Sequence, residues 1–313
     1  MIRRPPRSTQ GVSSAASDVY KRQVAITPAM PTGSGLVKML ETLPKQCIDV
    51  GIAEQHAVTL AAGMASQGML PFCVIYSTFL QRAYDQIIHD VAIQKLPIIF
   101  CIDRAGIVGH DGPTHHGLFD ISFLRCIPNI QIVAPRDSQE LQNILYTAQL
   151  GINLPLAIRY PRGYSEQKSL SFDFKKIPWG KGTLLKNGSH IAILSLGTIS
   201  KNIEKALSHV NYPEAFAHFD LCFAKPLDEE LLHKVFNKFK TVVVFEEGVK
   251  QGGVGSAVLE FASQKLYQVP IHLEGVSDIF VPHGDTDELF QEIGLDVNGI
   301  TKKLQLLLNK VLE

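Results

Sequence analysis

The sequence predicts an α/β protein built from two doubly wound parallel-sheet domains. Short apolar runs typical of buried strands alternate with helical segments of ten or more residues, and this alternation predicts parallel sheets covered by helices on both faces. The length of 313 residues is comfortable for two domains. Hydrophobic residues make up 45% of the chain and charged residues 19%, which is an ordinary globular composition.

The first domain is predicted over residues 24–165. Its strands are expected at 24–27, 46–50, 72–76, 97–102, 130–135 and 156–160. Its helices are expected after the loop at 28–36, from residue 54 through 57–65, around 81–86 and over 138–150. The strand segments are apolar at consecutive positions, so burial on both faces of the sheet is expected.

The second domain is predicted over residues 189–313, after a polar linker at 166–188 with room for one strand. Strands are expected at 191–196, 215–219, 241–245 and 271–276. Helices are expected over 198–209, 228–239, 252–262 and 285–292, and from residue 300 onward. Glycines follow the strand that ends at Glu246 and Glu247, but a Gly-rich run alone is weak evidence for a dinucleotide loop. We assign no catalytic residue there.

Residues 1–23 differ in composition from the rest of the chain. They are rich in Arg, Ser and Pro and have no hydrophobic core, so they are not a secretory signal. A transit peptide would fit this composition, but we interpret the segment as a non-native leader, translated from adapter sequence joined to a gene fragment. We expect it to be poorly ordered and exclude it from the fold.

Composition and charge exclude several classes of function. Lys plus Arg and Asp plus Glu both number 30, so the balance favours neither nucleic acid nor an acidic membrane as partner. No apolar run is long enough to span a bilayer. Five dispersed cysteines without metal-ligand spacing indicate reduced thiols and a cytoplasmic protein, and we expect no metal ligands in this chain.

Residues 49–57, with the sequence DVGIAEQHA, join a predicted strand to a predicted helix. This places Glu54 at the carboxyl edge of the sheet, where open α/β folds bind ligands. A Glu in the first turn of a helix is also favourable with the helix dipole and needs no function. The string nevertheless resembles the aminopyrimidine motif of thiamine-diphosphate enzymes of the transketolase type. The resemblance implies that Glu54 is catalytic: it bonds the pyrimidine N1′ and favours the imino tautomer, from a half-buried site that raises the carboxyl pKa.

Three further segments carry candidate site residues. Residues 76–86 follow a strand and include Phe79, which could stack on a flat ring or could be an ordinary core residue. Residues 103–117 combine several glycines with ionisable groups, and a loop of this kind suits close approach to a ligand. Residues 159–163, with the sequence RYPRG, end the first domain.

Together these segments resemble the family of 1-deoxy-D-xylulose-5-phosphate synthases, over about residue 24 to the end. The resemblance implies that Phe79 stacks on the aminopyrimidine and that Tyr76 lies in the cofactor and substrate pocket. It also implies that Arg82 and Arg162 bind the phosphate of the acceptor. The remaining implied residues, which bind donor and acceptor, are Arg104, Asp111 and the catalytic His115. Salt-bridging is a rival role for Arg104, Arg159 is expected to hold structure, and His116 is assigned no role.

The implied reaction joins pyruvate and D-glyceraldehyde 3-phosphate to give 1-deoxy-D-xylulose 5-phosphate and CO₂, for isoprenoid and thiamine synthesis. Members of the family are homodimers that hold Mg²⁺ and the diphosphate through a Gly-Asp-Gly motif in an N-terminal domain, and this sequence has no such motif. We therefore expect a C-terminal half that is inactive by itself. The alternatives are a β subunit of a 2-oxo acid dehydrogenase and a truncated, non-catalytic dimerising module.

Overall fold

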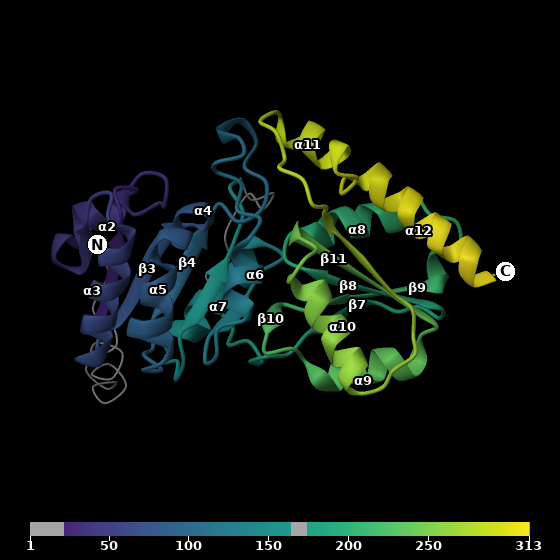
Figure 1. The fold of residues 1–313 in the computed structure, drawn as a ribbon, viewed down its shortest axis with the longest axis horizontal. Coiled ribbons are helices and arrows are strands. Elements are labelled where there is room, and N and C mark those ends of the chain that lie inside the picture. Colours follow the sequence, from purple (N-terminus) through teal and green to yellow (C-terminus); the bar gives the residue numbers. More distant parts are fainter. Residues whose placement is uncertain (1–21, 164–173, 313) are drawn as a thin grey trace, which may run out of the picture.

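The computed structural model describes residues 22–163 and 174–312. Two sheets lie side by side, each flanked by helices (Figure 1). The predicted two-domain α/β architecture is confirmed. The expected disorder of the leader and the first part of the predicted linker fall largely outside the described residues.

The first sheet has seven strands in the order β10-β5-β6-β4-β3-β1-β2. They are β1 (Gln23–Thr27), β2 (Cys47–Asp49), β3 (Leu70–Tyr76), β4 (Ile99–Asp103), β5 (Gln131–Val133), β6 (Leu156–Arg159) and β10 (Phe223–Lys225). All neighbours pair in parallel except β10, which comes from beyond residue 189 and pairs antiparallel with β5. The second half of the chain therefore completes the sheet of the first, which the sequence analysis did not predict.

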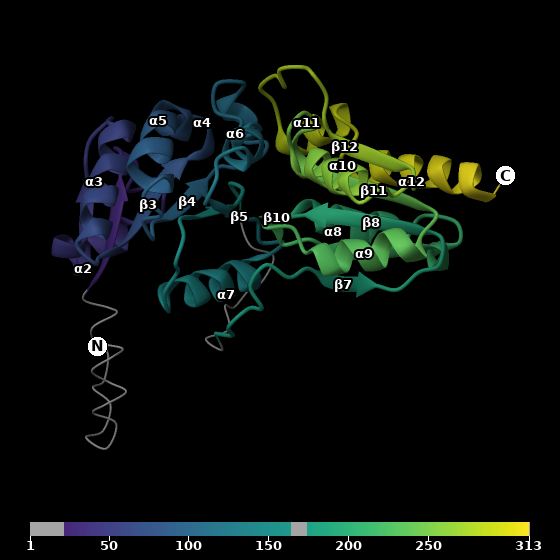
Figure 2. The same cartoon turned by 60° about the horizontal axis from the view of Figure 1, so that its bottom comes forward.

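Helices cover the two faces of the first sheet unequally (Figure 2). The helices are α2 (Val37–Thr42), α3 (Glu54–Ser66), α4 (Ser77–Leu80), α5 (Tyr84–Gln86), α6 (Asp120–Arg125) and α7 (Ser138–Gln149). Helices α3 to α6 lie on one face of this sheet, and α2 and α7 lie on the other. The helix expected around 81–86 is a series of short turns that ends in the π-helical η4 (Ile87–Ala92), and α6 was not predicted.

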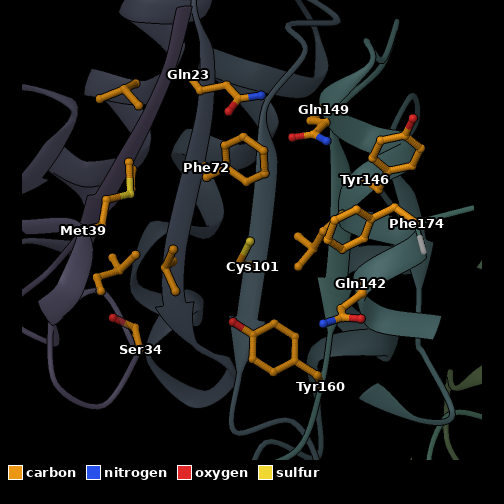
Figure 3. Close-up of a pocket in the computed structure, with 15 residues that line it drawn as sticks. Gln23, Ser34, Met39, Phe72, Cys101, Gln142, Tyr146, Gln149, Tyr160 and Phe174 are labelled. Carbon is orange, nitrogen blue, oxygen red and sulfur yellow. The ribbon is translucent and has the colours of Figure 1, made fainter. Parts of the chain in front are cut away.

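The residues that the structure describes cover the face beneath α2 and α7 only partly, contrary to the expectation of full cover. A groove of about 530 Å³ lies between the six-residue helix α2 and helix α7. Figure 3 shows Phe72 and Cys101 of the sheet lining this groove between Met39 of α2 and Tyr146 of α7.

The second sheet has five strands in the order β12-β11-β8-β9-β7. They are β7 (Thr183–Lys186), β8 (Ile191–Leu196), β9 (Phe216–Asp220), β11 (Thr241–Val249) and β12 (Ile271–Val276). Only β7 is antiparallel to its neighbour. The helices are α8 (Ile199–Leu207), α9 (Glu229–Lys238), α10 (Val254–Gln264), α11 (Thr286–Glu292) and α12 (Val297–Leu312). All six residues of β8 are buried, alternately toward α8 and α12 on one face and toward α9 and α10 on the other.

Buried polar contacts join the two domains. Arg159 at the end of β6 donates through Nε to Asp120 (2.9 Å) and through Nη2 to the carbonyl of Glu247 (3.0 Å). On the surface nearby, both terminal nitrogens of Arg125 contact the Glu260 carboxylate at 2.8 Å. These contacts hold the carboxyl edge of the first sheet against the second domain. The structural role expected for Arg159 is confirmed.

Candidate active site

The Glu54 carboxyl lies where strand β2 turns into helix α3. Gly51 makes the turn with φ +71°, a left-handed conformation that favours glycine, and its N–H donates to Asp49 Oδ1 (2.9 Å). Glu54 is the first helical residue and is 3% exposed. The strand, tight turn and helix expected from the sequence therefore place one carboxyl at the edge of the sheet.

Glu54 is the first member of a connected set of site residues. Its Oε1 accepts a hydrogen bond from Arg82 Nη1 (3.2 Å), and the Arg82 guanidinium lies 5.2 Å from the centre of the Phe79 ring. Phe79 stacks on Tyr76 with ring centres 5.8 Å apart and meets the edge of His115 at 5.3 Å. Arg82, predicted to bind phosphate, thus pairs with Glu54 here, while its side chain stays 54% exposed.

The set continues on the other side of Tyr76. The Arg104 guanidinium lies 3.8 Å from the centre of the Tyr76 ring, and its Nε is 3.8 Å from Asp111. Arg162 Nη1 donates to the same Asp111 carboxylate at 2.6 Å. Arg104 also lies 3.7 Å from Asp103, so it makes the ion pairs that its rival structural role requires. All eight predicted site residues are thus linked by direct contacts.

Two site neighbours were missed by the sequence analysis. The first is Gly33 in the 28–36 loop. A Cβ at this position would lie 1.7 Å from the Tyr76 hydroxyl, so only glycine allows the loop to lie this close to Tyr76. Asp103 accepts the Arg104 N–H at 2.6 Å, and burial raises the pKa of its carboxyl. The glycines of the 28–36 loop and the position of Asp103 at a strand end were the available signals.

The loop at 103–117 is closed at its base and clamped by the second domain. Gly106 and Gly117 exchange backbone hydrogen bonds, both at 2.7 Å. The buried Glu247 carboxylate accepts the Ile107 N–H at 2.8 Å, and a Cβ on Gly106 would collide with it. The second domain therefore contributes to holding this loop, although it was expected to contribute no catalytic residue.

The Gly-rich run after β11 is occupied by the chain itself. Glu246 accepts the N–H groups of Val254 (3.0 Å) and Gly255 (2.9 Å) at the start of α10. A Cβ on Gly253 would lie 2.2 Å from the same carboxylate. The helix N-terminus that could hold a phosphate in a dinucleotide fold thus binds an internal carboxylate instead.

The buried Glu246 leads to a prediction about pH. Burial raises its pKa from 4.5 to about 7, so between these values the folded chain holds a proton that the unfolded chain releases. The free energy of unfolding therefore falls as pH rises through this window, by on the order of 3 kcal/mol. Glu246→Gln should flatten this part of the pH dependence in urea unfolding at pH 5 to 8. Glu292→Gln on the exposed face of α11 is the matched control, and equal curves for both variants would contradict the assignment.

Within residues 22–163 and 174–312, no three His, Cys, Asp or Glu side chains gather closely enough to hold a metal ion. In the same residues, no helix is both long and apolar enough to cross a membrane. All five cysteines are free thiols, and only Cys126 is exposed.

Comparison with known families identifies the architecture. Residues 10–167 match the transketolase pyrimidine-binding domain, and residues 180–300 match the transketolase C-terminal domain. The chain therefore belongs to the transketolase family. More particularly, it is 50% identical over 292 residues to 1-deoxy-D-xylulose-5-phosphate synthase of Cytophaga hutchinsonii and 49% identical over 284 residues to that of Bacteroides fragilis. The predicted resemblance to these synthases is confirmed. The alignments cover 93% and 90% of this chain but 46% and 44% of the relatives, so the chain spans about half their length.

Two solved structures share the fold. A split-gene transketolase, described as an inactive β4 tetramer, matches with a TM-score of 0.80 and 27% identity over 96% of both chains. Transketolase from Campylobacter jejuni matches with a TM-score of 0.68 and 18% identity over 91% of this chain and 43% of that one. At 18% identity the second match shows the fold alone.

Proposed function

We propose that this chain is the pyrimidine-binding and C-terminal part of a 1-deoxy-D-xylulose-5-phosphate synthase that joins pyruvate to D-glyceraldehyde 3-phosphate with loss of CO₂. The observation that carries the proposal is the connected set that runs from the buried Glu54 carboxyl through aromatic rings to Arg104 and Arg162, in a chain 50% identical to such a synthase.

The residues present fit the pyrimidine of thiamine diphosphate. Glu54 offers a buried carboxyl, and the Phe79 ring lies beside the Arg82 guanidinium that contacts this carboxyl. A flat heteroaromatic ring would therefore find a hydrogen-bond partner in Glu54 and a stacking surface in Phe79. When bound, thiamine diphosphate supplies the nucleophilic carbon and the electron sink for decarboxylation. Glu54 would hold the proton at the pyrimidine nitrogen, and Tyr76 and Phe79 would exclude water from that face.

The acceptor phosphate is proposed to bind the arginines. The Arg162 side chain is 49% exposed, and one of the five N–H donors of its guanidinium reaches Asp111. Arg82 is similarly half-exposed beside Glu54. Planar guanidinium groups bind phosphate through paired hydrogen bonds, so these donors suit D-glyceraldehyde 3-phosphate. His115, at the edge of Phe79, would lie between the cofactor ring and the acceptor.

The test uses a reconstituted enzyme, in which the part of the Cytophaga hutchinsonii synthase that this chain does not match is joined ahead of Val24. Arg162→Ala deletes charge-assisted hydrogen bonds worth about 1.5–3 kcal/mol, so kcat/KM for D-glyceraldehyde 3-phosphate should fall about 10- to 150-fold. The loss with unphosphorylated glyceraldehyde should be much smaller, and the exposed Lys240→Ala should change neither. Equal losses with both aldehydes would indicate a structural arginine and favour the 2-oxo acid dehydrogenase alternative.

We further propose that Mg²⁺ and the diphosphate bind outside this chain, that the enzyme is a cytoplasmic homodimer, and that this chain alone is inactive. The split-gene transketolase, which aligns with this chain over 96% of both, is an inactive β4 tetramer, and this supports the proposed inactivity. Four buried free thiols fit a reducing compartment. We propose that this chain is non-catalytic in isolation and takes part in the synthase reaction only within a complete enzyme.

A further inference from the structure

His116 lies next to the proposed catalytic His115 and is 3% exposed. Its Nδ1 accepts the N–H of Val108 at 3.1 Å, and its Nε2 lies 3.0 Å from the carbonyl of Pro282. Because a carbonyl can only accept, Nε2 must carry a proton, and because a backbone N–H can only donate, Nδ1 must be unprotonated. The pattern therefore requires the neutral ring with its proton on Nε2, and it uses both nitrogens.

The two bonds tie together parts of the chain that are far apart in sequence. Val108 and His116 belong to the 103–117 loop, whereas Pro282 precedes α11 in the second domain. The same loop packs closely against the residues that follow Pro282. A Cβ on Gly109 would lie 2.8 Å from Thr286 Oγ1, and a Cβ on Gly112 would lie 3.1 Å from His283 Cβ. The loop therefore rests on this segment with no room for a larger residue.

We propose that His116 is a positioning residue that fixes the catalytic loop to the second domain. The N–H groups of His115 and His116 both donate to the carbonyl of Gly112, at 2.9 and 3.2 Å, so residues 112–116 form one hydrogen-bonded turn. Holding the His116 ring then fixes the direction in which His115 leaves the loop toward Phe79, and it holds Asp111 near Arg162. The catalytic meaning of this role rests on the proposed function, whereas the fixing of the loop does not.

The role needs the two hydrogen bonds and not merely a ring of this size. Leu at position 116 would fill the space but would leave the Val108 N–H and the Pro282 carbonyl without partners, and unpaired buried groups of this kind are costly. A Gln side chain offers an acceptor and a donor on one planar group, as the neutral His does. His116→Gln should therefore preserve the loop, and His116→Leu should release it.

The experiment is amide hydrogen exchange by NMR on the 313-residue chain, together with the ring ¹⁵N shifts of His116. In the unaltered chain the Nδ1 shift should be that of an unprotonated nitrogen. In His116→Leu the amides of Val108 and His115 should exchange about tenfold faster or more, while those of β4 stay unchanged. His116→Gln should match the unaltered chain. His110→Ala is the matched control, because His110 is an exposed histidine of the same loop.

Three results would overturn the proposal. The first is unchanged exchange at Val108 and His115 in His116→Leu. The second is faster exchange of β4 as well in that variant, which would make His116 a residue that supports the general fold. The third is equal behaviour of the His116→Gln and His116→Leu variants. In the reconstituted enzyme His116→Leu should lower kcat and His116→Gln should restore it. Hydrogen exchange is measured without turnover, so an inactive reconstituted enzyme would count against the proposed function and leave the positioning of the loop standing.

Discussion

Replacing Glu54 by Gln is expected to lower kcat of the reconstituted enzyme by about 10²- to 10⁴-fold, the usual loss when a positioned acid–base group is removed. Gln keeps the shape of the side chain and can still hydrogen-bond, but it cannot take up and release a proton at the pyrimidine nitrogen. The Glu54 carboxyl is buried and contacts Arg82, so nothing in bulk water can substitute for it readily. Exchange of the thiazolium C2 proton of thiamine diphosphate, followed by NMR, should slow in parallel with turnover.

The control for this substitution is Glu41→Gln, which changes an exposed carboxyl on α2 and should leave both rates unaltered. Removing Glu54 also leaves Arg82 without its carboxylate partner, so thermal unfolding of each variant must be compared. A folded Glu54→Gln variant that exchanges the C2 proton at the normal rate would contradict the catalytic assignment of Glu54.

The sequence predicted the fold wherever one local pattern decided the structure. The strands β8 and β4 are apolar at all positions but one, and this pattern predicts their burial on both faces. Strand β10 could not be predicted in the same way. It has three residues, and it forms only because the second half of the chain returns to pair with β5. Such a pairing depends on tertiary structure that a local window does not contain.

Strand β11 shows a second limit of pattern reading. It was expected over residues 241–245, with Glu246 and Glu247 at its end, but it continues to Val249, and both glutamates are buried. Two adjacent acidic residues normally indicate a segment that is exposed to solvent. Here their carboxylates are satisfied by backbone N–H groups of α10 and of the 103–117 loop. The partners lie eight or more residues away, so composition predicted the wrong strand end.

In the candidate site, too, the sequence predicted some features and not others. Residue types and motifs identified its members, and the structure brings these members into contact. The contacts themselves were not predictable: the Arg82 side chain turns to Glu54, and Arg104 is shared between Tyr76 and Asp111. His116 received no role from the sequence because only its two partners, one of them in the other domain, distinguish it from an ordinary buried histidine.

Replacing Arg159 by Met should cause the largest loss of stability that we predict, about 3–5 kcal/mol in the free energy of unfolding. Arg159 is 5% exposed and Asp120 is 1% exposed, so the substitution leaves a buried carboxylate without its cation. It also removes the hydrogen bond to the Glu247 carbonyl that joins the domains. Urea unfolding followed by circular dichroism should show a lower midpoint. Glu260→Gln is the control, because it breaks a more exposed ion pair between the same domains and should cost about 1 kcal/mol or less.

The double variant Arg159→Met with Asp120→Leu separates the contribution of the Asp120–Arg159 ion pair from that of the hydrogen bond to the Glu247 carbonyl. If the cost of the single change comes from the stranded Asp120 charge, removing that charge should recover much of the loss, since an apolar pair of similar volume can replace a buried ion pair. The Glu247 carbonyl stays without its donor in both variants, so recovery should be incomplete. If the stability losses of the single variants Arg159→Met and Asp120→Leu simply add in the double variant, Asp120 and Arg159 act independently. The coupling of the domains would then lie in the Glu247 contacts, which also hold the 103–117 loop through the Ile107 N–H.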